Sequence, residues 1–223
     1  MNKELVIAKY ARDVSWIEQI NPDVKIIIYN KNLNTLINNE ILIENNVGRC
    51  VHTFFYHICT RYNSLSDITF FAQDYPFDHS PDLINIINNF TLDYMPDNEM
   101  SNICHYDWHT PNNDISPVPY SDIRVKNYYY PLGNCILTEP SGVTSGHIKT
   151  DLDGKWNSIF KNSQLKKFYT MVAAGHFAIT KEGILCKPLS FYENIKNMLE
   201  TGGEFVPYEI ERLEAYIFNP LYT

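Results

Sequence analysis

The chain has 223 residues, of which 44% are hydrophobic and 20% are charged, and its formal net charge is -8 at pH 7. A chain of this length can bury one sizeable core, so we expect a single domain spanning residues 1–223. The acidic balance argues against a broad nucleic-acid interface, which needs a basic face, and no nucleic-acid partner is expected. An anionic ligand would have to be held locally, by a metal, an Arg or a helix N-terminus.

The five cysteines are scattered and none lies in a CxxC motif, so neither a zinc knuckle nor a disulfide framework is expected. This cysteine usage favours a reducing compartment. The N-terminal residues enter a strand-like run without the pattern of a signal peptide, and no apolar stretch is long enough to span a bilayer. We therefore expect a cytoplasmic protein without a membrane span.

The first third of the chain alternates short apolar runs with helical patterns. Strands are predicted at residues 4–10, 25–29 and 67–73. A short helix carrying Trp16 follows the first strand, with Asp13 or Ser15 as its cap, and a longer helix runs from about Asn45 to Tyr62. This order implies a doubly wound βαβ arrangement. The predicted fold class is α/β, with a mixed, mostly parallel central sheet flanked by helices.

The remainder of the chain is less regular. Helices are predicted at residues 82–89, 156–169, 190–200 and 207–218, and a strand broken by a glycine is predicted around 170–180. Between about residues 92 and 153, Pro, Asn, Asp, Ser and aromatic residues dominate and the elements look short. Irregular segments of this length in a compact domain are usually functional or mobile.

Polar residues follow the third predicted strand directly. Asp74 comes after Gln73, and a proline turn then brings Asp78 and His79. Ligands of open α/β sheets bind at the carboxyl ends of the strands, and this residue set suits Mn²⁺ or Mg²⁺. The alternative is a turn in which Asp caps the backbone and Pro fixes it. Residues 151–154 hold a literal Asp-x-Asp as a rival metal site, although Asp-Gly favours a surface turn.

The order of several motifs resembles a family of small GT-A-type glycosyltransferase-like proteins, to which an enzyme encoded by chlorella viruses is similar. The segments that carry the resemblance are Ala8–Trp16, Tyr29–Lys31, Asn46–Arg49, Tyr62–Leu65 and Phe70–Gln73 with His79, and more weakly Gly175–Ile179 and Glu211–Phe218. Two positions depart from the family pattern: Cys50 stands where Glu is usual, and Leu213-Glu214 replaces the usual aromatic residue.

The resemblance implies a metal-dependent glycosyltransferase. Its donor would be a nucleotide-diphosphate sugar, with UDP as the expected nucleotide, its cofactor would be Mn²⁺ or Mg²⁺, and its acceptor would be a glycan or glycoprotein. Residues of about 1–91 would form the nucleotide-sugar-binding half and about 92–223 the acceptor-side half. If the protein is viral, the expected location is the host cytoplasm. The alternative function is a non-catalytic nucleotide- or glycan-binding module of the same fold.

The predicted site residues fall into three groups. Donor-binding residues at strand and helix ends are Ala8, Lys9, Tyr10, Asp13, Asn30, Lys31, Asn46, Gly48, Arg49 and Gln73. The metal ligands are Asp78, Asp74 and His79, with Asp78 as the principal one. The catalytic residues are Asp78, Glu211 and His176; Glu211 would meet the acceptor hydroxyl, with Glu209 as the alternative, and His176 would face the metal or the acceptor. For Asp13 the structural alternative is a helix cap, for Gly48-Arg49 a turn with a solvated Arg, and for His176 a satisfied core histidine.

Overall fold

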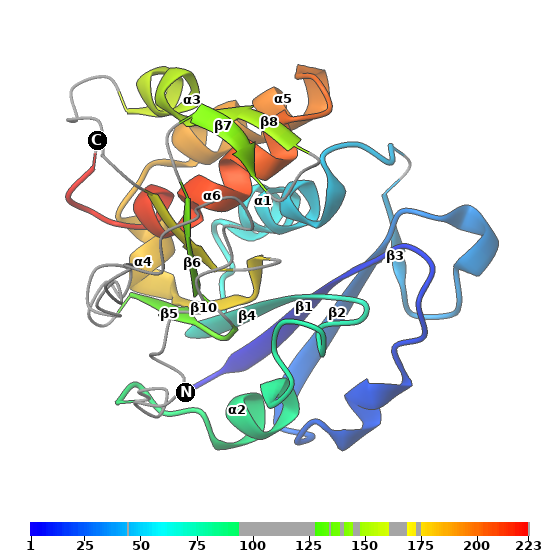
Figure 1. Cartoon of the computed structure of the whole chain (residues 1–223). Coiled ribbons are helices and arrows are strands. Elements are labelled where there is room, and N and C mark those ends of the chain that lie inside the picture. The colour runs from blue at the N-terminus through cyan, green and yellow to red at the C-terminus, as the bar shows by residue number, and fades with distance from the viewer. Residues whose placement is uncertain are drawn as a thin grey trace, which may run out of the picture.

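Six strands form the central sheet of the computed structural model, in the order β3-β2-β1-β4-β10-β5 (Figure 1). They are β1 (Lys3–Lys9), β2 (Val24–Asn30), β3 (Ile41–Leu42), β4 (Ile68–Gln73), β5 (Tyr129–Pro131) and β10 (Phe177–Thr180). β1 pairs in parallel with β2 and β4, β2 pairs in parallel with β3, and β10 is antiparallel to β4 and β5. The predicted α/β class, with a mixed and mostly parallel sheet, is confirmed.

The structure describes residues 1–43, 45–93, 128–133, 135–138, 141–144, 148–160, 169–172 and 175–222. Two small antiparallel sheets accompany the central one: β6 (Cys135–Thr138) pairs with β9 (Tyr169–Val172), and β7 (Ser141–Thr144) pairs with β8 (Ile148–Asp151). Most of the segment predicted to be irregular lies outside the described residues. None of the helices within the described ranges is long and apolar enough to cross a membrane.

Helices cover both faces of the central sheet (Figure 1). One face carries α1 (Arg49–Arg61), α5 (Leu189–Thr201) and α6 (Val206–Ile217), and the other carries α2 (Leu83–Asn89) and the 3₁₀ helix η1 (Ser15–Gln19). The remaining helices are the 3₁₀ helix η2 (Leu33–Thr35), α3 (Leu152–Ile159) and α4 (Lys181–Leu185).

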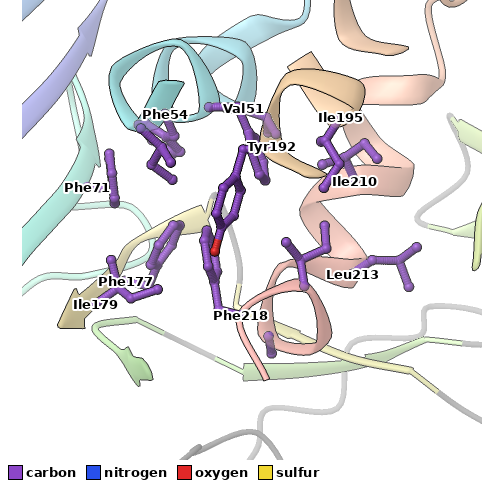
Figure 2. Packing of buried hydrophobic residues seen from close by; sticks show 14 of the residues in the cluster. Val51, Phe54, Phe71, Phe177, Ile179, Tyr192, Ile195, Ile210, Leu213 and Phe218 are labelled. Atoms are coloured by element: carbon purple, nitrogen blue, oxygen red, sulfur yellow. The ribbon is translucent and has the colours of Figure 1, made fainter. Parts of the chain in front are cut away.

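Alternation along the strands supplies both layers of the core. Successive side chains of a strand point to opposite faces, so Phe71 packs with the α1 layer while Phe70 and Ala72 pack with α2. Figure 2 shows the larger cluster, in which Phe54 of α1 and Phe177 of β10 meet Phe71, with ring centroids 5.0 Å apart for Phe54–Phe71 and for Phe71–Phe177. These aromatic contacts fix α1 over the sheet.

Three sequence predictions of local structure are wrong. The helix predicted at 156–169 ends at Ile159, where the Phe160 N–H bonds back to the Trp156 carbonyl and Phe160 turns extended. The strand predicted around 170–180 is two strands, β9 and β10, which belong to different sheets. η1 has Val14 at its N-cap with no side-chain cap, because the Asp13 carboxylate instead accepts from the Ser15 hydroxyl.

The path of the chain predicts a ligand site at the carboxyl ends of the central strands. From β1 the chain moves to β2 on one side, and from β2 it crosses over to β4 on the other side of β1. In doubly wound sheets, ligands bind at the carboxyl ends of the strands where this reversal occurs. Here that point lies between the ends of β1 and β4, at Lys9 and Gln73.

Candidate functional site

A cavity of about 1020 Å³ lies at this edge of the sheet. Its walls come from the ends of β1 and β4, from residues 46–50 and Thr53 at the start of α1, and from residues 199–208 between α5 and α6. The predicted site residues that line it are Ala8, Lys9, Tyr10, Lys31, Asn46, Gly48, Arg49, Gln73 and Asp74. The wall from α5 and α6 was not predicted, so the second half of the chain helps to close a cavity expected mainly from the first.

The N-terminus of α1 faces the cavity through Gly48, Arg49 and Cys50. The first bond of this helix runs from the His52 N–H to the Gly48 carbonyl, at 2.9 Å, so the N–H groups before it have no acceptor within the helix. Gly48 has φ +64°, and a Cβ there would lie 2.6 Å from the Cβ of His52, so this tight start needs glycine. Arg49 also has a positive φ, of 53°, and its guanidinium lies 4.8 Å from the ring centre of Tyr208.

The Lys31 side chain binds the backbone of this helix start. Its Nζ donates to the carbonyls of Val47 and Arg49, at 2.5 and 2.6 Å. The side chain is buried, and desolvation lowers the pKa of Lys31 to about 8. Lys31 therefore brings a titratable positive charge to the same wall of the cavity as Arg49.

Lys9 and Asn30 hold the loop that follows β2. Lys9 Nζ lies 2.5 Å from the Glu40 carboxylate, and Asn30 donates to the other oxygen of Glu40 at 2.8 Å. Lys9 also donates to the Thr35 carbonyl at 3.1 Å, while Asn30 is fully buried and does not line the cavity. The structure therefore places Asn30 outside the cavity lining, where it positions the carboxylate that pairs with Lys9.

Asp74 lines the cavity but is turned toward the backbone. Its Oδ2 accepts from the N–H groups of Tyr10, Ala11 and Arg12, at 3.0, 3.2 and 3.0 Å. These three bonds fix the loop after β1 to the end of β4. Asp74 thus shapes the rim on which Tyr10 is displayed, with that ring 51% exposed.

The predicted metal cluster does not form. Asp78 and His79 are exposed and lie outside the cavity lining, in a turn closed by bonds from the His79 and Ser80 N–H groups to the Pro76 carbonyl. Across the described ranges, no group of three or more His, Cys, Asp or Glu side chains could hold a metal. Asp13 is also exposed and outside the lining; its bond from Ser15 is the first cause that lowers the pKa of its carboxyl.

The rival motif at residues 151–154 has a structural role. Asp151 ends β8 and caps α3, accepting from the Gly154 N–H at 2.9 Å. Asp153 accepts from the Tyr169 hydroxyl at 2.8 Å, which ties α3 to β9. The motif forms the junction between β8 and α3, so the predicted surface turn is wrong.

The carboxylates and the imidazole predicted for the second half are placed differently from expectation. Glu209 is a structural anchor that accepts from the Asp151 N–H at 3.0 Å and pairs with Lys155 at 3.3 Å. His176 is fully buried and lies 2.8 Å from the Ser80 hydroxyl through Nδ1, and burial lowers its pKa to about 3. Glu211 is half-buried on α6 near the cavity floor, where its charge helps to raise the pKa of Cys50, but neither it nor His176 lines the cavity.

Sequence reasoning missed Glu214. This side chain is 1% exposed, and neither carboxyl oxygen has a hydrogen-bond partner in the part of the chain that the structure describes. Burial, and then the charge of Glu211, raises its pKa well above the ordinary value. A signal was present, because Glu214 follows Ile210 by four residues and precedes Ile217 by three, within the apolar stripe of α6.

Glu214 lies just behind the cavity floor. A Cβ on Gly175, whose φ is +63°, would lie 3.0 Å from one Glu214 oxygen, so only glycine leaves room for this carboxyl. Glu214 also lies close enough to Cys50, which lines the cavity, to act on the pKa of its thiol. Gln73 in turn donates to the Cys50 sulfur at 3.3 Å, and both of these residues line the cavity.

The opposite rim is open where α5 passes into α6. Gly202 and Gly203 line it, and a Cβ built on Gly203 would meet no atom within 4 Å. Glu204 adds negative charge to this rim, while the charge of Glu200 is paired with Lys196 at 2.8 Å. The cavity is therefore cationic on one side and acidic on the other.

Similarity to known proteins is found at the level of a family. Neither the curated proteins nor the solved structures include a match to the chain. A family model described as a protein of unknown function (DUF3431) matches residues 5–222 of the 223 residues. The chain therefore belongs to this family of unknown function, DUF3431.

Proposed function

We propose that the protein is a glycosyltransferase that binds a nucleotide-diphosphate sugar, UDP-linked in the first instance, and transfers the sugar to a hydroxyl of a glycan or glycoprotein. The observation that supports this most is the cavity at the strand reversal, with Arg49 and the α1 N-terminus on one wall. Its volume of about 1020 Å³ is at the upper end of the range for ligand sites, which suits a ligand as large as a nucleotide sugar.

The α1 wall supplies what a diphosphate leaving group needs. Negative charge builds on the diphosphate as the glycosidic bond breaks, so donors aimed at it stabilise the transition state more than the ground state. The guanidinium of Arg49 can fork onto phosphate oxygens, and the unpaired N–H groups of the helix start favour anions. Lys31 adds positive charge beneath the same helix start.

Mn²⁺ or Mg²⁺ is part of the proposal, but the described residues do not form a site for either ion. Asp74 is the carboxylate that lines the cavity at the end of β4, and its Oδ2 is already taken by three backbone N–H groups. No step of the proposed transfer reaction is therefore assigned to a metal. The neutralisation of the diphosphate is assigned to Arg49 and the α1 N-terminus.

A binding test decides the proposal. We expect UDP to raise the melting temperature of the protein in EDTA, because Arg49 and the α1 N-terminus hold the diphosphate, and a parallel series with Mn²⁺ measures whether the ion enlarges the rise. Arg49→Ala should remove most of the UDP effect and Arg49→Lys should restore only part of it, because the fork geometry is lost. Arg61→Ala, at the far end of the same helix, is the matched control. The absence of a shift with UDP, with or without Mn²⁺, would sink the proposal for this nucleotide.

A non-catalytic nucleotide- or glycan-binding module is the second candidate. The saturation of Asp74 and the dispersal of Asp78 and His79 away from the cavity favour it. The two candidates differ in turnover. Slow release of UDP from UDP-glucose in the absence of an acceptor, lost in Arg49→Ala, supports the enzyme, whereas binding of UDP-glucose without any release supports the module.

A further inference from the structure

The cavity has an inner surface, which we define as the side chains of Cys50, Thr53 and Gln73. All three line the cavity, and Thr53 lies one helical turn beyond Arg49. Thr53 is fully buried and lies one turn further along α1 than Arg49, so it lies deeper in the wall than the helix start to which Cys50 belongs. The chemistry of this surface differs from that of the cationic wall above it.

The side-chain hydroxyl of Thr53 is a buried polar group that lacks a partner among the described residues. Its side chain is fully buried, and Oγ1 has no partner among the described residues. A helical Thr usually bonds the carbonyl four residues earlier, which here belongs to Arg49. That carbonyl instead receives Lys31 Nζ at 2.6 Å. Buried hydroxyls are nearly always satisfied, so this one points to a ligand group that bonds it in the occupied cavity.

The rest of the inner surface is polar but uncharged. Desolvation raises the pKa of the Cys50 thiol to about 12, so no thiolate forms at neutral pH. The amide of Gln73 donates to the Cys50 sulfur, which is a weak acceptor that a better one can replace. The carboxyl of Glu214 packs against Gly175 immediately behind, and burial raises its pKa well above the ordinary value.

Charge around the inner surface selects against a second anionic group. Glu211 is close enough to disfavour ionisation of both Cys50 and Glu214. A carboxylate placed here would lose its hydration and would face the same field, in which the negative charge of Glu211 outweighs the positive charge of Arg49 at Cys50. Hydroxyl groups, which donate and accept, match Thr53 without that cost.

We propose that the inner surface is the sugar subsite of the cavity, that Thr53 bonds a hydroxyl of the sugar, and that the subsite accepts neutral hexoses and rejects uronic acids. This inference rests on the proposed function and deepens it, by naming the class of sugar. Arg49 and the α1 start hold the diphosphate, and the inner surface holds the uncharged end of the same ligand.

The test compares the dissociation constants of UDP, UDP-glucose and UDP-glucuronate by calorimetry. In the wild type we expect UDP-glucose to bind about 3- to 10-fold more tightly than UDP, the range for one good hydrogen bond, and UDP-glucuronate to bind no more tightly than UDP. Thr53→Val should abolish the advantage of UDP-glucose and leave the constant for UDP unchanged. Thr60→Val, an exposed Thr on the same helix, should keep the wild-type ratio.

Stability gives a second readout for the same variant. Because Thr53 Oγ1 has no partner in the described structure, Thr53→Val should melt at or above the wild-type temperature, so a lost ratio is not a folding defect. A wild-type ratio in Thr53→Val, or a gain for UDP-glucuronate equal to that for UDP-glucose, overturns the sugar subsite while the proposed function stands. If UDP itself does not bind, the proposed function fails and the subsite fails with it.

Discussion

Two carboxyl groups near the end of β4 are in opposite situations. Asp74 receives three backbone N–H groups from the loop after β1, whereas Glu214 has no hydrogen-bond partner in the described parts of the chain. From the sequence, Asp74 is the functional candidate, whereas Glu214 is noted only as part of a departure from the family pattern. The difference shows that a carboxylate placed directly after a strand readily accepts hydrogen bonds from nearby backbone N–H groups. An acid inside an apolar stripe is the one that folding leaves unsatisfied.

The largest expected effect comes from removing the satisfied carboxylate. Asp74→Ala frees three N–H groups and releases the loop at residues 10–12, so we expect a loss of about 3 kcal/mol in the free energy of unfolding, measured with urea. Asp78→Ala is the matched control, because Asp78 is exposed, and its effect should stay within about 0.5 kcal/mol. Equal losses in the two variants would contradict the structural role of Asp74.

Glu214 should behave in the opposite way and with a dependence on pH. Its folded-state pKa is raised above the value of 4.5, so its contribution to stability is complete below about pH 4.5 and is lost as the pH rises toward the folded-state pKa. Glu214→Gln removes this loss. We expect the advantage of the variant over the wild type to grow as the pH rises above about 4.5, by at most about 1.4 kcal/mol per pH unit.

Urea titrations of the wild type and Glu214→Gln at a series of pH values measure this difference. Glu211→Gln is an informative companion, because removing the charge of Glu211 should reduce the loss in the wild type without abolishing it. A pH-independent gap between wild type and Glu214→Gln would show that Glu214 ionises at its ordinary pKa.

The smallest expected effect is on the affinity for UDP and comes from a buried cation, Lys31. Lys31 is satisfied by two carbonyls, as Asp74 is by N–H groups, but burial lowers its pKa to about 8. We expect the affinity for UDP to fall about threefold as the pH rises from 7 to 9, when this charge is lost beside the anion. Calorimetry across that range tests it, and the thermal shift with Lys31→Met should show no such fall.

Much of the sheet edge was predictable because the strands β1, β2 and β4 are short apolar runs that end in polar residues. The reversal of strand order then brings those ends together, which is why Tyr10, Gly48 and Arg49 were correctly expected at one cavity. The partners of these residues were not predictable. Asp74 bonds backbone groups 62 to 64 residues away, and no local pattern reports such a contact.

The second half was harder to predict for a related reason. The sequence predicts a helix over residues 156–169, yet Trp156 packs against Tyr169 because the chain ends α3 at Ile159 and returns as β9. Likewise, the wall at residues 199–208 reaches the cavity through contacts between α1 and α5, such as the close approach of Gly48 to Leu199. Long-range packing of this kind decides which acids and glycines matter.

The open position of Gly203 has a practical consequence. Gly48 and Gly175 leave no room for a side chain, so substitutions there should be tolerated poorly in any mutational scan. Gly203 lines the same cavity with nothing within 4 Å of an added Cβ. A cysteine at position 203 could therefore carry a fluorescent label at the rim, and its emission would report occupancy of the cavity without disturbing the wall that holds the ligand.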